Sequence, residues 1–334
     1  MTTARRDVRT ERFAAHIEAH GLTRARVLEQ VDESFGDPLL VVAAGSVIAG
    51  FGNDTSDLDL YVVVQDDVAS TLPLMSYAKS ARIDVIITGA GQLKARHAEL
   101  SAGAWPPQDI SPGDLVEQRK LFDTFSRFGL GLPLDGTPQW LDWQRRLDGE
   151  ITGWLRAWYA VEAVRMRSAA RALAGHKPLA AALRAGEAVI AALERHAVTK
   201  GERYFKWKWV GEKLRRLGDR DGLAAFELAM RPPLTADEAP AYLRRAEEVL
   251  DTYLSDVDAS GWEVCLLPAA GTSWRPFGEG HLVSRWGLRA AAVSTGSPVS
   301  ARGRWTYHPG EPWHPDVVSL FAEDMLWLGI RSAP

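Results

Sequence analysis

The sequence predicts an α+β protein in three parts. Residues 1–135 indicate a mixed β-sheet domain with N-terminal helices at 4–33, residues 136–255 a helical bundle, and residues 256–334 a small tryptophan-rich α+β module. Three observations support this division. Short β-branched apolar runs occur in the first part, long helix-period patterns fill the second, and short β-like runs with six of the 13 tryptophans lie in the third.

The composition is typical of a globular protein. Hydrophobic residues make up 46% and charged residues 25% of the 334 residues. No apolar run approaches the roughly 20 residues that span a bilayer, and the first residues, MTTARRDVRTERF, lack the apolar stretch of a secretion signal. The single cysteine, Cys265, can form neither an internal disulfide nor a cysteine-rich zinc site. We therefore expect a cytoplasmic protein with no membrane partner.

The first part is expected to start with two short helices and to continue into a buried sheet. Apolar residues recur at helical spacing over 4–33, with a break at HGLT, where Thr23 is a candidate N-cap. Three β-branched apolar runs follow, PLLVVAAGS, LDLYVVV and ARIDVIIT. Proline, glycine and aspartate predict loops at GAWPPQDISPGD and GLGLPLDGTP, and the stretch LVEQRKLFDTFSRF between them predicts a helix.

Long helical patterns begin at Trp140 and continue to about Leu254, with breaks at GHKP and RPPLTADEAP. These patterns predict the bundle. The runs WEVCLLP and LRAAAVST are β-like, and the tryptophans of the third part are expected to form its core.

Two acidic side chains interrupt the second apolar run. Asp57 and Asp59 are two residues apart, so in a strand they point to one face while Leu58 and Leu60 point to the other. Holding two carboxylates together in a site poor in water needs compensation, and a divalent cation such as Mg²⁺ supplies it. Asp84 lies alone in the third run and joins the pair if the three runs share one sheet. The sequence therefore predicts a three-carboxylate magnesium site.

Gly45 and Ser46 lie at the start of the same motif. A glycine lets a phosphate approach the backbone, and a serine hydroxyl with the amides at the start of a following helix can donate to phosphate oxygens. The stretch GSVIAG lacks the Gly-Lys-Ser/Thr ending of a P-loop, which excludes that class of nucleotide hydrolase. Transfer of a nucleotidyl group is the alternative chemistry for a triphosphate at such a site.

The stretch GSVIAGFGNDTSDLDL resembles the signature of the DNA polymerase β-like nucleotidyltransferase superfamily. That signature has Gly-Ser, a Gly four residues after the Ser, and Ser-Asp-x-Asp about ten residues on. The matching residues are Gly45, Ser46, Gly50, Ser56, Asp57 and Asp59, and Asp84 matches the third family acid between two hydrophobic residues. A sheet domain followed by a bundle resembles the branch with the aminoglycoside and lincosamide nucleotidyltransferases. The resemblance covers about residues 36–220 and leaves 255–334 outside.

The resemblance implies two-metal phosphoryl chemistry on a nucleoside triphosphate. Asp57 and Asp59 would hold two Mg²⁺ ions, and Asp84 would hold the catalytic ion and accept the proton of the attacking hydroxyl. Gly45, Ser46 and Ser56 are the nucleotide-binding residues of the matching motif.

A second candidate for nucleotide binding lies in KGERYFKWKWVGEKLRRLGDR. Placed on one helix, Lys206 and Lys213 fall inside an apolar arc formed by Trp207, Trp209, Val210, Leu214 and Leu217. A lysine there needs an anionic partner, and a triphosphate could supply it. The alternative, a lysine whose stem lies on the core and whose ammonium reaches water, stays open. Arg82 is also left open between tuning the acids, contacting phosphate and forming an ion pair.

We expect a Mg²⁺-dependent enzyme that moves AMP from ATP onto a hydroxyl of a small molecule. Two alternatives remain. The acceptor could be a tRNA 3′ end or a protein side chain, because nine Lys and Arg against three acids lie between Arg195 and Arg220, although the net charge of −4 argues against broad nucleic-acid binding. The protein could also be a nucleotide-binding pseudo-enzyme, against which the three retained acids argue.

Overall fold

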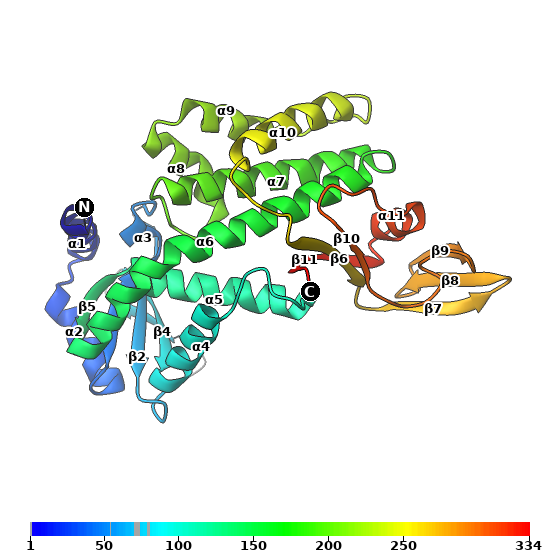
Figure 1. Ribbon diagram of the computed structural model, residues 1–334. Helices are drawn as coiled ribbons and strands as arrows, with labels where there is room; N and C mark the ends of the chain where they lie inside the picture. Colours follow the sequence, from blue (N-terminus) through cyan, green and yellow to red (C-terminus); the bar gives the residue numbers. More distant parts are fainter. Residues whose placement is uncertain (1, 54, 70–73, 79–80) are drawn as a thin grey trace. The chain divides into compact units, whose positions relative to one another are not determined.

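The computed structural model describes residues 2–53, 55–69, 74–78 and 81–334, and for 2–7, 74–78 and 81 the backbone alone. The chain forms two compact units (Figure 1). Unit 1 comprises Met1–Gly103, Arg119–Trp154 and Arg203–Phe205, and unit 2 comprises Ala104–Gln118, Leu155–Glu202 and Lys206–Pro334. Helices and several sheets occur together, in agreement with the α+β class. The domain boundaries near residues 135 and 255 stay predictions.

A five-stranded mixed sheet lies at the centre of unit 1. Its strands are β1 (Leu40–Ala44), β2 (Leu58–Val64), β3 (Leu74–Ala78), β4 (Ala81–Gly89) and β5 (Leu132–Gly136), in the order β3-β4-β2-β1-β5. β2 and β4 are parallel, and the other neighbouring strands are antiparallel. The prediction that the three β-branched runs form strands of one sheet is confirmed by β1, β2 and β4.

The edge strand β5 differs from the prediction of a loop at GLGLPLDGTP. Pro133 has no N–H to donate, and the segment has little intrinsic preference for strand. Leu132 and Leu134 are nevertheless buried in the core of unit 1, and the segment pairs with β1. On the outer edge, the Arg24 guanidinium donates to the carbonyl of Leu134. Burial of two leucines thus outweighs local propensity here.

Helices cover the sheet of unit 1. They are α1 (Thr2–Ala19), α2 (Arg24–Phe35), α3 (Gly45–Ala49), α4 (Ala90–Ala102) and the unit 1 residues of α5 (Pro112–Leu130) and α6 (Pro138–Leu173). α1 and α2 confirm the two predicted helices, and the Thr23 hydroxyl caps α2 by accepting from the Arg26 amide at 3.2 Å. The apolar residues of α1, α2 and α3 pack on one face of the sheet, where they form a core with Leu58, Leu60 and Val85. Helix α5 contacts the other face, where Phe128 meets Tyr61.

The long helices of unit 2 confirm the helical patterns predicted beyond Trp140. They are the rest of α6, α7 (Pro178–Thr199), α8 (Val210–Leu217), α9 (Arg220–Ala229) and α10 (Ala239–Tyr253), with a short 3₁₀ helix η1 (Trp207–Trp209) before α8. The contact face of α7 is rich in alanine, with Ala182, Ala185, Ala188 and Ala192 buried. Small side chains of this kind let neighbouring helices approach closely.

Unit 2 ends in two three-stranded sheets. The strands β6 (Trp262–Pro268), β10 (Trp305–Tyr307) and β11 (Leu326–Ser332) form one sheet, and β7 (Thr272–Phe277), β8 (Gly280–Arg285) and β9 (Arg289–Ser294) form the other. Helix α11 (Pro315–Ala322) precedes β11. Trp305 and Trp313 lie in the core, as expected, whereas Trp286 is 64% exposed at the turn between β8 and β9.

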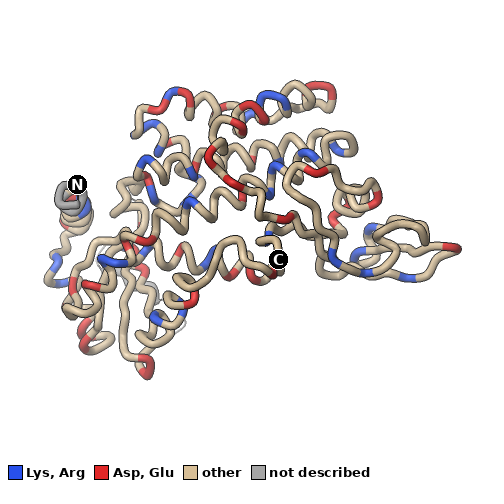
Figure 2. The backbone as a smooth tube through the Cα atoms, viewed as in Figure 1, with Lys and Arg blue, Asp and Glu red and all other residues tan. Residues whose placement is uncertain are grey.

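Charges of both signs are interspersed along the chain, as Figure 2 shows. The totals are nearly equal, with 39 Lys and Arg against 43 Asp and Glu. In the part of the chain that the structure describes, every helix is too short or too polar to cross a membrane.

Candidate functional site

Two parallel strands bring the predicted acids together in unit 1. In the pairing of β2 with β4, Asp59 lies directly opposite Asp84, and Asp57 lies two residues before Asp59. Side chains at paired positions of neighbouring strands point to the same face. Leu58 and Leu60 point to the opposite face, where each is 1% exposed. The expectation that Asp84 joins the other two acids in one sheet is therefore confirmed.

Two arginines contact these acids. On the last turn of α5, Arg127 donates from Nη1 to Asp59 Oδ2 at 2.6 Å, and its Nε lies 3.5 Å from Asp123 Oδ1. On β4, Arg82 forms an ion pair with Asp57, and its Nε lies 3.8 Å from Asp84 Oδ1. Of the roles left open for Arg82, the structure shows the ion pair.

Arg127 is a site residue that sequence reasoning missed. Its spacing of four residues from Asp123 predicts an exposed helical ion pair, which is an ordinary surface feature. Only the packing of α5 on the sheet, where Phe128 meets Tyr61 edge-on at 5.3 Å, turns Arg127 toward Asp59. A basic residue in the last turn of a predicted helix was the only available signal.

The carboxylate of Asp59 is affected by burial, by the charge of Arg127 and by two neighbouring acids. Burial raises the pKa of Asp59, Arg127 opposes that rise, and the nearby charges of Asp84 and Asp57 add to it. The three acids therefore concentrate negative charge at one place on the sheet, as the sequence predicts, and the two arginines balance part of it.

Gly45 packs against the carboxylate of Asp59. It follows β1, begins α3, and has φ of 87°, a region that favours glycine. A Cβ at this position would overlap Asp59 Oδ2 and lie 3.2 Å from Arg127 Nη1. The sequence predicts that Gly45 lets a phosphate approach the backbone. In the structure the group that approaches it is the Asp59 carboxylate, and contact with phosphate stays a prediction.

Replacing Gly45 by alanine should both strain the backbone and displace Asp59 from Arg127. We expect a loss of about 1–3 kcal/mol in the free energy of unfolding. Gly149→Ala is the matched control, because Gly149 lies within α6 and a Cβ there would meet nothing within 4 Å. That control should gain about 0.5–1 kcal/mol. Urea denaturation measures both, and equal effects of the two substitutions would contradict the assigned close approach.

The two serines of the motif have different surroundings. Ser46 is half-buried at the second position of α3, and its carbonyl accepts from the amides of Phe51 and Gly52 at 2.8 and 2.9 Å. The Ser56 hydroxyl donates to Asn53 Oδ1 at 3.0 Å and accepts from the Asn53 amide at 2.9 Å. Ser56 therefore shapes the turn before β2, which places Asp57. Binding of a nucleotide by either serine stays a prediction.

A segment from far along the chain completes the surroundings of Arg127. Arg203 donates to the carbonyl and carboxylate oxygens of Asp148 on α6, both at 2.8 Å. This anchor holds Tyr204 so that its ring stacks on Phe51, with centroids 5.4 Å apart, and faces the Arg127 guanidinium at 5.5 Å. Residues 203–205 thus belong to unit 1, which their place in the sequence does not suggest.

The chemistry of the three acids suits Mg²⁺, which prefers oxygen ligands in proteins. Asp84 Oδ1 is buried and accepts no hydrogen bond from the described residues, so it has capacity for a further partner. With the side chains as they stand, the described residues contain no group of three or more His, Cys, Asp or Glu arranged to hold a metal ion. The carboxylates are directed instead toward Arg82 and Arg127.

The structure changes the interpretation of Lys206 and Lys213. They do not lie on one helix, because Lys206 precedes the 3₁₀ turn η1 and α8 begins only at Val210. Trp207, expected in the apolar arc, is 59% exposed. Lys213 is fully buried in unit 2, with Nζ 2.5 Å from Oε2 of the equally buried Glu194. Its anionic partner is thus a carboxylate of its own unit and not a triphosphate, whereas a role for Lys206 stays a prediction.

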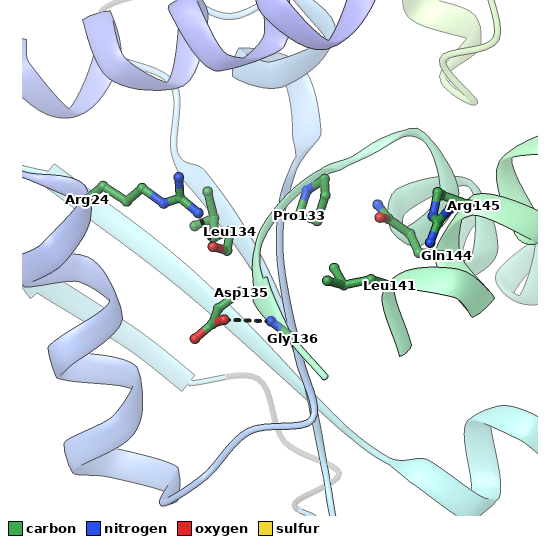
Figure 3. Close-up of a pocket in the computed structure, with 8 residues that line it drawn as sticks. All are labelled: Arg24, Pro133, Leu134, Asp135, Gly136, Leu141, Gln144 and Arg145. Atoms are coloured by element: carbon green, nitrogen blue, oxygen red, sulfur yellow. Dashed lines mark hydrogen bonds between the residues drawn. The ribbon is translucent and has the colours of Figure 1, made fainter. Parts of the chain in front are cut away.

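A cavity of about 490 Å³ lies along β5 in unit 1, lined by Arg24, Pro133, Leu134, Asp135, Gly136, Leu141, Gln144 and Arg145 (Figure 3). Asp135 and Gln144 in this lining already form hydrogen bonds with the backbone. Asp135 accepts from the amide of Gly136 at 2.8 Å, the bond that Figure 3 draws as a dashed line. Gln144 donates to the carbonyls of Phe128 and Gly131. The lining includes none of the three site aspartates.

No protein-family model matches this chain, and no curated protein matches it in sequence. Among solved structures, a nucleotidyltransferase-like protein from Exiguobacterium sibiricum 255-15 aligns with 14% identity and a TM-score of 0.40, over 69% of this chain and 77% of that chain.

Proposed function

We propose that this protein is a Mg²⁺-dependent nucleotidyltransferase that moves a nucleoside monophosphate, AMP from ATP, onto a hydroxyl of a small molecule. The observation that carries the proposal is the parallel pairing of β2 and β4, which sets Asp59 beside Asp84 with Asp57 next to them. The mutual repulsion of three acids gathered in this way is costly, and Arg82 and Arg127 balance only part of it. The order of a sheet domain followed by a helical bundle resembles the antibiotic nucleotidyltransferases, and this resemblance suggests the small acceptor.

In this proposal the three acids have separate tasks. Asp57 and Asp59 would hold two Mg²⁺ ions, and Asp84 would hold one of them. When bound, the ions neutralise the charge that develops on the phosphate oxygens. Asp84 would also accept the proton of the acceptor hydroxyl, and its buried Oδ1 has no hydrogen-bond donor among the described residues. Gly45, Ser46 and Ser56 would line the phosphates.

The proposed reaction is a displacement at the α phosphorus of the triphosphate. The acceptor oxygen forms a bond to the α phosphorus, and the bond from that phosphorus to the bridging oxygen of the β phosphate breaks. The proton of the hydroxyl passes to Asp84, and pyrophosphate leaves. Most of the rate enhancement then comes from positioning and from neutralised charge.

A pyrophosphate-release screen tests the proposal. The protein is incubated with each of the four ribonucleoside triphosphates, Mg²⁺ and a panel of small hydroxyl compounds, and ATP should give the strongest signal. EDTA should abolish it. No release with any nucleotide and acceptor, while a triphosphate still binds, would contradict the proposed transfer.

One observation favours a non-catalytic alternative. Arg82 and Arg127 already balance the acids, so these residues could serve a nucleotide-binding pseudo-enzyme that needs no metal. Such a protein would bind ATP equally well with Mg²⁺ and with EDTA, whereas the proposed enzyme would lose most of its affinity in EDTA.

Ion pairing weakens the case for a tRNA acceptor. Of the nine basic residues between Arg195 and Arg220, at least five lie in ion pairs: Arg195 with Asp256, Arg203 with Asp148, Lys213 with Glu194, and Arg215 and Arg216 with Glu212. Paired cations contribute less to phosphate binding, because they release fewer counterions. When the protein is incubated with labelled ATP and total RNA or a cell extract, macromolecules should stay unlabelled. A labelled RNA or protein would instead identify that macromolecule as the acceptor.

A further inference from the structure

Arg127 contacts a carboxylate that would ligate the proposed metal ions. It contacts Asp59, the central acid of the three, and its side chain is only 12% exposed. A divalent cation on the same carboxylate would repel the guanidinium strongly, because a partly buried site screens the two charges poorly. A metal ion that took Asp59 Oδ2 would therefore compete with Arg127 for that oxygen.

The surroundings of Arg127 allow it to change partners without leaving the site. Asp123, one turn earlier on α5, lies 3.5 Å from its Nε, and that Nε is buried without a hydrogen bond to the described residues. The ring of Tyr204, stacked on Phe51, borders the guanidinium on another side. A guanidinium has five N–H donors and suits phosphate oxygens well. It therefore keeps unused donors beside the acids.

We propose that Arg127 is an exchange cation: it balances Asp59 in the metal-free protein and donates instead to the triphosphate when metal and nucleotide bind. This inference rests on the proposed function. Arg82 is less suited to the role, because its side chain is 45% exposed and water already screens its charge. Asp123 keeps Arg127 near the site in both states.

The proposal predicts opposite effects of Arg127→Gln on two ligands. Binding of Mn²⁺ alone, followed by electron paramagnetic resonance of the free ion, should tighten about 10-fold, because a competing cation is gone. Binding of α,β-methylene-ATP in the presence of Mn²⁺ should weaken by about 10-fold or more, because a charge-assisted hydrogen bond to phosphate is lost. Arg127→Lys should lie between wild type and Arg127→Gln for both ligands.

Two controls keep the experiment decisive. Arg26→Gln removes an arginine that pairs with Glu29 on the surface of α2, and it should change neither affinity. Mn²⁺ should also raise the Tm of Arg127→Gln more than that of wild type, because the ion takes over the balance of Asp59. If Arg127→Gln shifts the affinities for Mn²⁺ and for α,β-methylene-ATP in the same direction, or shifts neither, the proposed exchange of partners by Arg127 is wrong. A wild-type protein that binds neither Mn²⁺ nor the triphosphate would overturn the proposed function itself.

Discussion

Replacing Asp84 by asparagine is expected to lower the rate of pyrophosphate release by about 10²–10⁴-fold. Asparagine keeps the shape of the side chain but cannot accept the proton of the acceptor hydroxyl, and it is a weaker ligand for Mg²⁺. The fold should survive, because Asp84 is half-buried and asparagine removes a charge that the neighbouring acids repel. Rate measurements with saturating ATP and Mg²⁺ separate the chemical step from binding.

Asp135→Asn is the matched control for this substitution. Asp135 also lies on the central sheet, but on the edge strand β5, where it accepts from the amide of Gly136. We expect its effect on the rate to be under about 2-fold, because Asp135 is exposed on a strand that pairs with neither β2 nor β4, and a surface substitution of this kind leaves the fold intact. If Asp84→Asn retains the wild-type rate, Asp84 has no part in proton transfer.

Replacing Lys213 by methionine is expected to cost about 3–5 kcal/mol in the free energy of unfolding. The substitution leaves Glu194 without its partner in the core of unit 2, where both side chains are 0% exposed. Burial raises the pKa of Glu194, an effect that Lys213 opposes, so without Lys213 this carboxyl remains buried and poorly satisfied. Urea denaturation followed by circular dichroism measures the loss.

Two further variants distinguish the buried pair from a surface pair. Lys213→Met combined with Glu194→Met should recover most of the lost stability, because two apolar side chains of similar length replace two charges. Arg184 pairs with Glu187 on the exposed side of the same helix α7, and Arg184→Met should cost no more than about 0.5 kcal/mol. A double variant as unstable as the single one would contradict the assigned ion pair.

The acids of the site could be predicted because a strand has a strict two-residue period. Asp57 and Asp59 interrupt an apolar run at that period, and Asp84 does the same in a later run. No comparable rule predicts the arginines. Arg127 and Tyr204 reach the site from positions about 70 and 145 residues beyond Asp59, through the packing of α5 and the anchor of Arg203 on Asp148.

The stretch from Lys206 to Leu217 shows where a periodic pattern misleads. The apolar spacing suits a helix, but the first residues form the 3₁₀ turn η1, which rotates each residue differently from an α-helix. The predicted face therefore holds only within α8, where Val210 and Leu214 are buried. Lys213 does lie on that face, and its partner Glu194 comes from α7.

By itself the sequence determined the α+β class, the strands β1, β2 and β4, the long helices, and the single face that Asp57 and Asp59 share, because each follows from local periodicity and apolar burial. The tertiary structure alone decided that β5 is a strand, that Arg127 balances Asp59, and that Lys213 is buried against Glu194. These features depend on contacts between residues far apart in the chain, whose energy no local pattern contains.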